Sequence, residues 1–134
     1  MIVVDTQMLV YFATAGPYAP LAEGVFARDP VWISSPLWRS EFRQAIAGSV
    51  RRGELSVEAA IAAFTGAERV LTQEITPTTD DVIRLLTTSR CSAYDLEFVA
   101  LARSLGVPLV TNDRQVLAAF PRVAVAPDAF TSAP

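Results

Sequence analysis

The sequence contains no histidine, no lysine and only one cysteine among its 134 residues. Without histidine, Ser-His-Asp and Cys-His catalysis and imidazole metal ligands are excluded. Without lysine, mechanisms that use a lysine base or a Schiff base are excluded. The single cysteine, Cys91, cannot form an internal disulfide. We interpret it as a small packed residue of a reducing compartment.

Long hydrophobic segments are also missing. The longest unbroken apolar run, Met8 to Ala13, is far shorter than the roughly 20 residues that a membrane-spanning helix needs. The N-terminus has no basic segment and carries an early carboxylate, Asp5, which argues against a signal peptide. We therefore expect a cytoplasmic protein without a membrane partner.

The chain is nevertheless apolar enough to fold: 51% of its residues are hydrophobic and 19% are charged. This balance excludes intrinsic disorder, which requires low hydrophobicity and high charge. The length fits one domain, and no linker, repeat or low-complexity tract divides it. We expect a single domain over residues 1–130 and a frayed tail over residues 131–134.

Short β-branched apolar runs alternate with longer segments of helical periodicity. Such runs are typical of strands buried on both faces of a parallel sheet. We therefore predict an α/β fold, a three-layer sandwich around a central, mostly parallel sheet. The predicted strands are Ile2–Val4, Val31–Ser34, Val107–Thr111 and Val123–Val125, with a further short candidate at Glu74–Thr76.

Several helix ends are recognisable in the sequence. Ser35-Pro36 predicts the start of a helix that runs to about Arg52, and Ser56 predicts the start of a helix whose apolar positions reach Leu71. Thr78 and Ser92 each precede an acid by three residues, which is a capping-box spacing. Gly106 is expected to end the helix that follows Ser92.

Four of the fourteen acids fall at unusual positions. Asp5 and Asp113 follow predicted strands, where ligands of open parallel sheets bind, while Glu41 and Asp95 lie on inward faces of predicted helices. Unpaired buried carboxylates repel one another and are costly to desolvate. A hard divalent cation, Mg²⁺ or Mn²⁺, would remove that cost and support phosphoryl-transfer chemistry.

Each of the four acids also has an ordinary structural interpretation, which is weakest for Asp5. Asp113 could cap the next helix, Asp95 could be the acidic partner of a capping box, and Glu41 could pair with an arginine such as Arg39 or Arg43. An acid at the end of a buried strand has little structural use. Glu97, two residues from Asp95, remains a further candidate.

The chain resembles the PIN-domain ribonucleases, specifically the VapC-type toxins of bacterial type II toxin–antitoxin pairs. The resemblance spans residues 2–113 in the family's order and spacing. Its segments are Val3-Val4-Asp5-Thr6 with Leu9-Val10-Tyr11, Ser35-Pro36-Leu37 with Glu41, Ser92-Ala93-Tyr94-Asp95 with Ala100-Leu101-Ala102, and Leu109-Val110-Thr111-Asn112-Asp113.

This resemblance implies a PIN-like fold and a metal-dependent endoribonuclease that uses Mg²⁺ or Mn²⁺ and leaves a 5′-phosphate and a 3′-hydroxyl. It implies Asp5 and Asp95 as the most regular metal ligands, completed by Glu41 and Asp113. Supporting roles fall to Thr6, Ser92 and Thr111. The sequence departs from the family pattern at Gln7, where asparagine or serine is more usual, and at Phe98, where tyrosine is common.

The implied partners are an RNA substrate, a cognate antitoxin and a second copy of the chain in a homodimer. The net charge is −3, yet residues 28–52 hold five arginines against two acids. Arg39 and Arg43 are therefore candidate RNA contacts. These arginines are equally compatible with a solvated helix face or an acidic antitoxin segment. We also expect Trp38 or its neighbours to line the antitoxin groove or the dimer interface.

Other functions are compatible with a small α/β sandwich. A non-catalytic PIN-like module that binds RNA or protein is the main alternative, and an absence of Mg²⁺ and Mn²⁺ binding would favour it. A phosphoacceptor receiver domain needs a lysine, which is missing. A dehalogenase-like phosphatase needs a second aspartate two residues after the first, but position 7 is a glutamine. Flavodoxin-like binding needs a glycine-containing loop after the first strand, and residues 5–8 contain no glycine.

Overall fold

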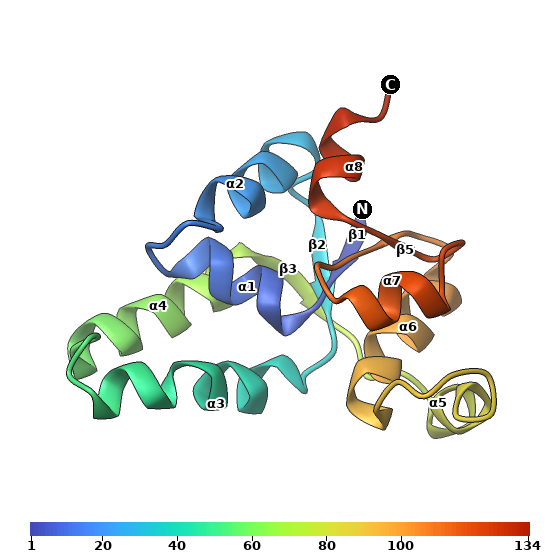
Figure 1. Cartoon of the computed structure of the whole chain (residues 1–134), viewed down its shortest axis with the longest axis horizontal. Helices are drawn as coiled ribbons and strands as arrows, with labels where there is room; N and C mark the ends of the chain where they lie inside the picture. The colour runs from blue at the N-terminus through green and yellow to red at the C-terminus, as the bar shows by residue number, and fades with distance from the viewer.

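A sheet of five short parallel strands forms the centre of the protein (Figure 1). The computed structural model describes residues 1–134. The strand order is β3-β2-β1-β4-β5, and every neighbouring pair is parallel, which confirms the predicted α/β sandwich. The strands are β1 (Ile2–Val4), β2 (Trp32–Ser34), β3 (Leu71–Glu74), β4 (Leu109–Val110) and β5 (Ala124–Val125).

Eight helices connect and cover these strands. They are α1 (Thr6–Ala13), α2 (Ala19–Arg28), α3 (Trp38–Arg51), α4 (Val57–Val70), α5 (Thr79–Leu85), α6 (Ala93–Leu105), α7 (Arg114–Ala119) and α8 (Pro127–Ser132). None of them combines the length and the apolar character required to cross a lipid bilayer.

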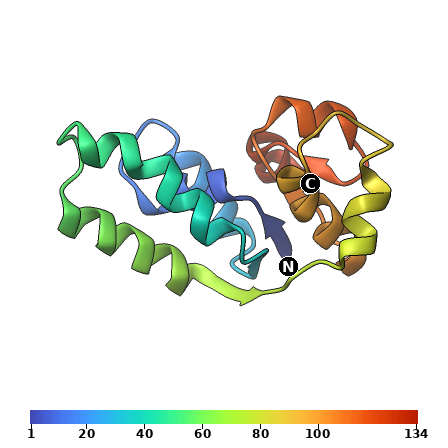
Figure 2. The same ribbon diagram turned by 90° about the horizontal axis from the view of Figure 1, so that it is seen from below.

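Side chains of each strand alternate between two apolar cores, because successive residues of a strand point to opposite faces. Val3 of β1 packs into the core beneath α6, whereas Ile2 and Val4 pack into the core beneath α1 and α4. The helices form two matching layers: residues 6–70 supply one, and residues 79–119 the other (Figure 2). Cys91 is buried in the core beneath α6, as expected.

Chain order creates a crevice beside β1. The chain runs from β1 outward through β2 to β3, then returns to β4 on the other side of β1. In open α/β sheets, such a reversal leaves a crevice at the carboxyl ends of the strands, where ligands bind. The ends of β1 and β4, which lead to Asp5 and Asp113, lie at this point.

Several predicted helix ends are confirmed. The hydroxyl of Thr78 accepts a hydrogen bond from the backbone N–H of Asp81, and Ser92 accepts one from Asp95. Gly106 ends α6 in the left-handed conformation, with φ +66°. Residues with a β-carbon rarely adopt that backbone conformation, which explains why a glycine occupies position 106.

The start of α3 differs from the prediction. The helix begins at Trp38 rather than at Ser35-Pro36, and its N-cap residue, Leu37, has no side-chain cap. The Ser35 hydroxyl donates instead to Oε2 of Glu97, at 2.7 Å, and accepts from the backbone of Leu37. A tertiary partner thus uses the hydroxyl that the sequence pattern assigned to capping.

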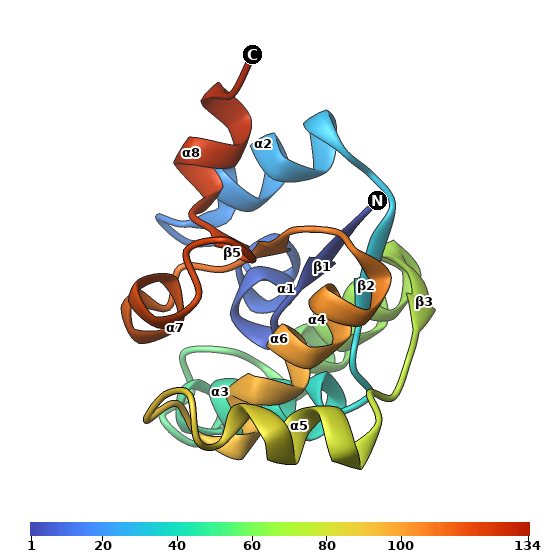
Figure 3. The ribbon, with the colours of Figure 1, turned by 90° about the vertical axis from the view of Figure 1, so that its right-hand side faces the viewer.

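Two further elements differ from expectation. The third strand is Leu71–Glu74 rather than Glu74–Thr76, and Leu71 pairs with Trp32 instead of continuing the preceding helix. A last helix, α8, was not predicted. It packs beside α2 (Figure 3) and includes Thr131 and Ser132, which had been assigned to the tail.

Trp38 itself does not line a groove or an interface, and the prediction that its neighbours do so stays a prediction. Its side chain is fully buried, stacks on Phe64 at 4.9 Å between ring centroids, and donates from its indole Nε1 to Glu74. Trp38 is therefore part of the core between α3, α4 and β3 and lines no surface groove.

Candidate active site

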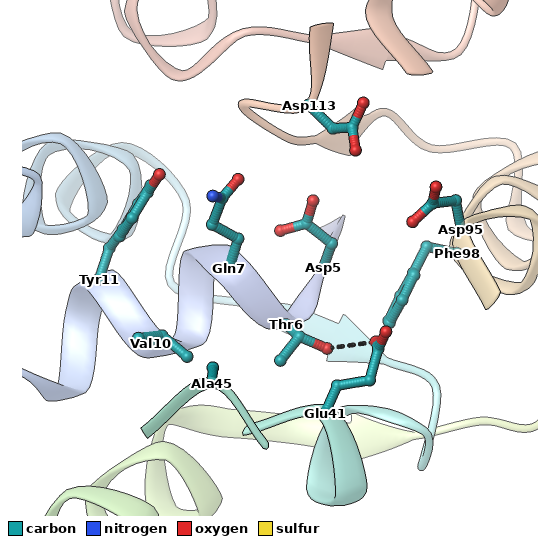
Figure 4. A pocket seen from close by; sticks show the side chains of 10 residues that line it. All are labelled: Asp5, Thr6, Gln7, Val10, Tyr11, Glu41, Ala45, Asp95, Phe98 and Asp113. Atoms are coloured by element: carbon teal, nitrogen blue, oxygen red, sulfur yellow. Dashed lines mark hydrogen bonds between the residues drawn. The ribbon is translucent and has the colours of Figure 1, made fainter. Parts of the chain in front are cut away.

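The four acids singled out in the sequence line one cavity of about 350 Å³ (Figure 4). Asp5 follows β1, Glu41 lies in the first turn of α3, Asp95 in the first turn of α6, and Asp113 follows β4. Residues up to 108 positions apart in the sequence thus face a common space at the carboxyl edge of the sheet.

Asp5 is the N-cap of α1 and the most strongly perturbed acid of the cavity. Its Oδ1 accepts a hydrogen bond from the backbone N–H of Met8 at 3.1 Å, and its Oδ2 accepts one from the Thr111 hydroxyl at 2.5 Å. Burial raises the pKa of Asp5 from its usual 3.8 to about 6, despite both hydrogen bonds. The negative charges of Asp113 and Asp95 add to this increase.

Thr111 joins the two acids that follow neighbouring strands. Its fully buried hydroxyl donates to Asp5 and accepts from the backbone N–H of Asp113 at 3.0 Å. Asp113 also caps α7, since its Oδ1 accepts from the backbone of Gln115 and Val116. The structural interpretation of Asp113 is therefore correct, yet it also lines the cavity.

Glu41 is held by a hydroxyl rather than by an arginine. The Thr6 hydroxyl donates to its Oε1 at 2.8 Å. Arg39 pairs instead with Glu68 and Glu74, each at 2.8 Å, so the alternative of a Glu41–arginine pair is not supported. Burial, followed by the nearby charges of Asp95 and Glu97, raises the pKa of Glu41.

Asp95 combines both interpretations that the sequence left open. It belongs to the Ser92 cap of α6, and it also lines the cavity. Burial raises the pKa of Asp95, the Ser92 hydroxyl lowers it, and the charge of Asp113 raises it further. The hydroxyls of Thr6 and Ser92 therefore each contact one of the four acids, and the Thr111 hydroxyl contacts two.

No basic side chain lines the cavity. Four carboxylates without a counter-charge explain why burial and mutual repulsion raise the pKa of three of them. No three acids lie close enough as they stand to enclose a metal ion. All donors in the cavity are oxygens and no positive charge balances them, which nevertheless fits a hard divalent cation. The acidic side chains would have to rotate to enclose it.

The remaining lining residues include several that sequence reasoning did not assign to a site. Gln7 and Tyr11 extend the cavity along α1, above an apolar floor to which Val10 and Ala45 contribute. Positions 7 and 11 lie on one face of the helix that follows Asp5, and this spacing is the sequence feature that could have placed both residues at the site. Phe98 also lines the cavity, whereas Glu97 does not, and the carboxylate of Glu97 accepts a hydrogen bond from the Ser35 hydroxyl.

Neither Arg39 nor Arg43 lines the cavity. Arg39 is bound to two glutamates and lies over the Trp38 ring at 5.1 Å. Arg43 is exposed, lies 5.9 Å from the Phe64 ring centroid and donates only to the Ser40 hydroxyl. Of the two arginines, only Arg43 is free of a carboxylate partner.

Comparison with known proteins identifies the family of the chain. The family model of the PIN domain matches residues 2–125. The structure is similar to PAE2754 from Pyrobaculum aerophilum, with a TM-score of 0.78, 23% identity and coverage of 97% of this chain and 92% of that one.

It is also similar to VapC20 from Mycobacterium tuberculosis, described as a toxin that cleaves the sarcin–ricin loop. The TM-score is 0.67 with 25% identity, over 89% of this chain and 95% of that one. No curated protein sequence matches the chain significantly. With a family match over nearly its whole length, the chain belongs to the PIN domain family.

Proposed function

We propose that this protein is a metal-dependent endoribonuclease and acts as the toxin of a toxin–antitoxin pair. The observation that carries the proposal is the cavity lined by Asp5, Glu41, Asp95 and Asp113 without any basic side chain. Membership of the PIN domain family and the similarity to a VapC toxin support the same reaction class.

Asp5, Asp95, Asp113 and Glu41 are the residues that would hold the divalent cation, Mg²⁺ or Mn²⁺. When bound, the cation supplies charge neutralisation and lowers the pKa of water. The missing positive charge of the cavity and the raised pKa of Asp5 support this assignment.

The protein's own residues hold the acids in position. Thr111 fixes Asp5 relative to Asp113, and Thr6 fixes Glu41. In the proposed reaction, the oxygen of a water molecule bonds to phosphorus in line with the leaving group. The bond between phosphorus and O3′ breaks, and O3′ takes up a proton. The products are a 5′-phosphate and a 3′-hydroxyl.

A protein partner is part of the proposal. An antitoxin would have to cover the cavity or a surface near it, and a second copy of the chain would form the homodimer. Val57 and Ile61 on α4 support a protein contact, since both side chains are more than half exposed.

The decisive experiment is incubation of the purified protein with total RNA, with and without Mg²⁺ or Mn²⁺, followed by mapping of the cut ends. We expect cuts only with the cation, carrying 5′-phosphates. Asp5→Asn and Asp95→Asn should abolish them. Cleavage that persists in both variants would mean that a contaminant cuts the RNA. No cleavage together with no cation binding would favour a non-catalytic module.

A further inference from the structure

The cavity extends past the four acids along one face of α1. Gln7 and Tyr11, one helical turn apart, line this extension (Figure 4). Their side chains point to the same side of the helix as Asp5. At 1.5 Å per residue, Tyr11 lies about 9 Å along the helix from Asp5. The extension is thus close enough to hold a group next to the one at the acids.

Tyr11 is held in place by a second tyrosine. Its ring stacks on that of Tyr18, with centroids 4.8 Å apart and planes inclined by 20°. Tyr18 is 47% exposed and lies just before α2. The stacking therefore limits the movement of the Tyr11 ring, which lines the cavity, while Tyr18 itself does not line it.

Gln7 offers unused hydrogen-bonding groups in the same space. Its side chain is exposed, and its amide makes no hydrogen bond within the protein. A free amide presents two donors and an acceptor. Together with the ring of Tyr11 and the apolar floor at Val10, it provides both the flat contact and the edge contacts that an unpaired nucleobase requires.

Charge gives a second reason to expect a base at this position. The cavity contains four acids and no arginine, so the protein itself attracts no phosphate there. Without a bound cation, affinity for RNA next to the acids therefore has to come from an uncharged part of the nucleotide. Stacking on aromatic side chains is the usual source of such affinity.

We propose that Gln7 and Tyr11 form a nucleobase subsite, which binds an unpaired base of the nucleotide next to the bond that is cut. Tyr11 provides the stacking surface, Tyr18 supports it, and Gln7 selects the base through its edge. This inference rests on the proposed function, because it assigns the substrate contacts of the same site.

Binding can be tested apart from cleavage by adding EDTA and measuring fluorescence anisotropy with short single-stranded RNA oligonucleotides. One set carries bases and a matched set is abasic, so that charge is equal. We expect the wild-type protein to prefer the intact set by roughly 5- to 150-fold, and Tyr11→Ala to lose this preference. Tyr11→Phe should keep it, since phenylalanine retains the stacking ring.

Tyr94→Ala is the matched control, because Tyr94 is 62% exposed but does not line the cavity. Circular dichroism and melting temperatures establish that each variant is folded. Gln7→Ala should change which base is found next to the mapped cut ends, because Gln7 is the residue proposed to select that base. If the protein cleaves RNA but Tyr11→Ala binds both sets like the wild type, the subsite is wrong and the proposed function stands. Equal wild-type affinity for both sets would also overturn the subsite, whereas failure to cleave RNA would overturn the proposed function.

Discussion

The Thr111 hydroxyl donates a hydrogen bond to Oδ2 of Asp5 at 2.5 Å, across two neighbouring strands. The same oxygen accepts from the backbone of Asp113, so one hydroxyl fixes two of the four acids. Because this hydroxyl is fully buried, neither bond can be replaced by water without a rearrangement of the strand ends.

Thr111→Val removes that hydroxyl with little change in volume. The hydrogen bond lowers the pKa of Asp5, so its loss should raise this pKa above about 6. The free energy of unfolding should fall by about 1–3 kcal/mol, because a buried carboxylate and a backbone N–H lose a partner. Carboxyl titration by NMR and urea unfolding measure the two effects. Thr111→Ser is the control, and an unchanged Asp5 pKa in Thr111→Val would contradict the assignment.

Asp5 should make the protein more stable in mild acid than at neutral pH. Its folded-state pKa of about 6 exceeds the usual 3.8, so between these values the folded state binds more protons than the unfolded state. This contribution to stability is present below about pH 4 and is lost as the pH rises through 6. The raised pKa values of Glu41 and Asp95 act in the same direction.

Asp5→Asn isolates this contribution. At pH 7 in EDTA it should stabilise the protein by up to about 3 kcal/mol, since each pKa unit corresponds to about 1.4 kcal/mol. The difference from the wild type should shrink towards pH 4. Thermal unfolding across this range measures it. A variant less stable than the wild type at pH 7 would show that the Asp5 charge is already compensated in the folded protein.

Divalent cations should offset the loss of stability that repulsion between the four carboxylates causes. Mn²⁺ should raise the melting temperature of the wild-type protein by mass action and should leave Asp95→Asn nearly unchanged. Asp81→Asn is a matched control, because Asp81 is an exposed acid outside the cavity. Isothermal titration calorimetry gives the affinities. Equal Mn²⁺ binding by wild type and Asp95→Asn would remove Asp95 from the ligand set.

Thr6 should control metal affinity through Glu41. Thr6→Val deletes the hydroxyl that donates to Glu41 Oε1, and loss of such a supporting bond typically weakens metal binding by about 10- to 100-fold. Thr6→Ser keeps the hydroxyl and should restore the affinity. Calorimetric titration with Mn²⁺ is the measurement. If valine and serine variants bind equally well, the Thr6–Glu41 contact has no role in the site.

The two arginines that the sequence treats alike should behave differently. Arg39→Ala should lower the free energy of unfolding by about 1 kcal/mol, since Arg39 joins α3 to Glu68 and Glu74 and covers Trp38, although its side chain is partly exposed. Arg43→Ala should leave stability unchanged. If Arg43 contacts RNA, its loss should reduce the salt dependence of binding by about one phosphate contact. The reverse pattern would contradict these roles.

The composition of the sequence determined the kind of chemistry that is available. With no histidine and no lysine, the acids become the main candidates for catalysis, and Asp5 and Asp113 stand out because they follow apolar strands. Local signals also determined the caps at Thr78 and Ser92 and the end of α6 at Gly106, since these depend on residues three or four positions apart.

Only the tertiary structure decided which groups meet. Ser35 follows a local capping pattern, yet its hydroxyl binds Glu97, 62 residues away, and α3 therefore starts later than predicted. Trp38 is buried because α4 and β3 cover it, and Arg39 is occupied by acids of those same elements. Gln7 and Tyr11 line the same cavity as the four acids because the order of the strands places those acids beside α1. Such partners depend on how the strands are ordered in space, and short sequence patterns carry no information about that order.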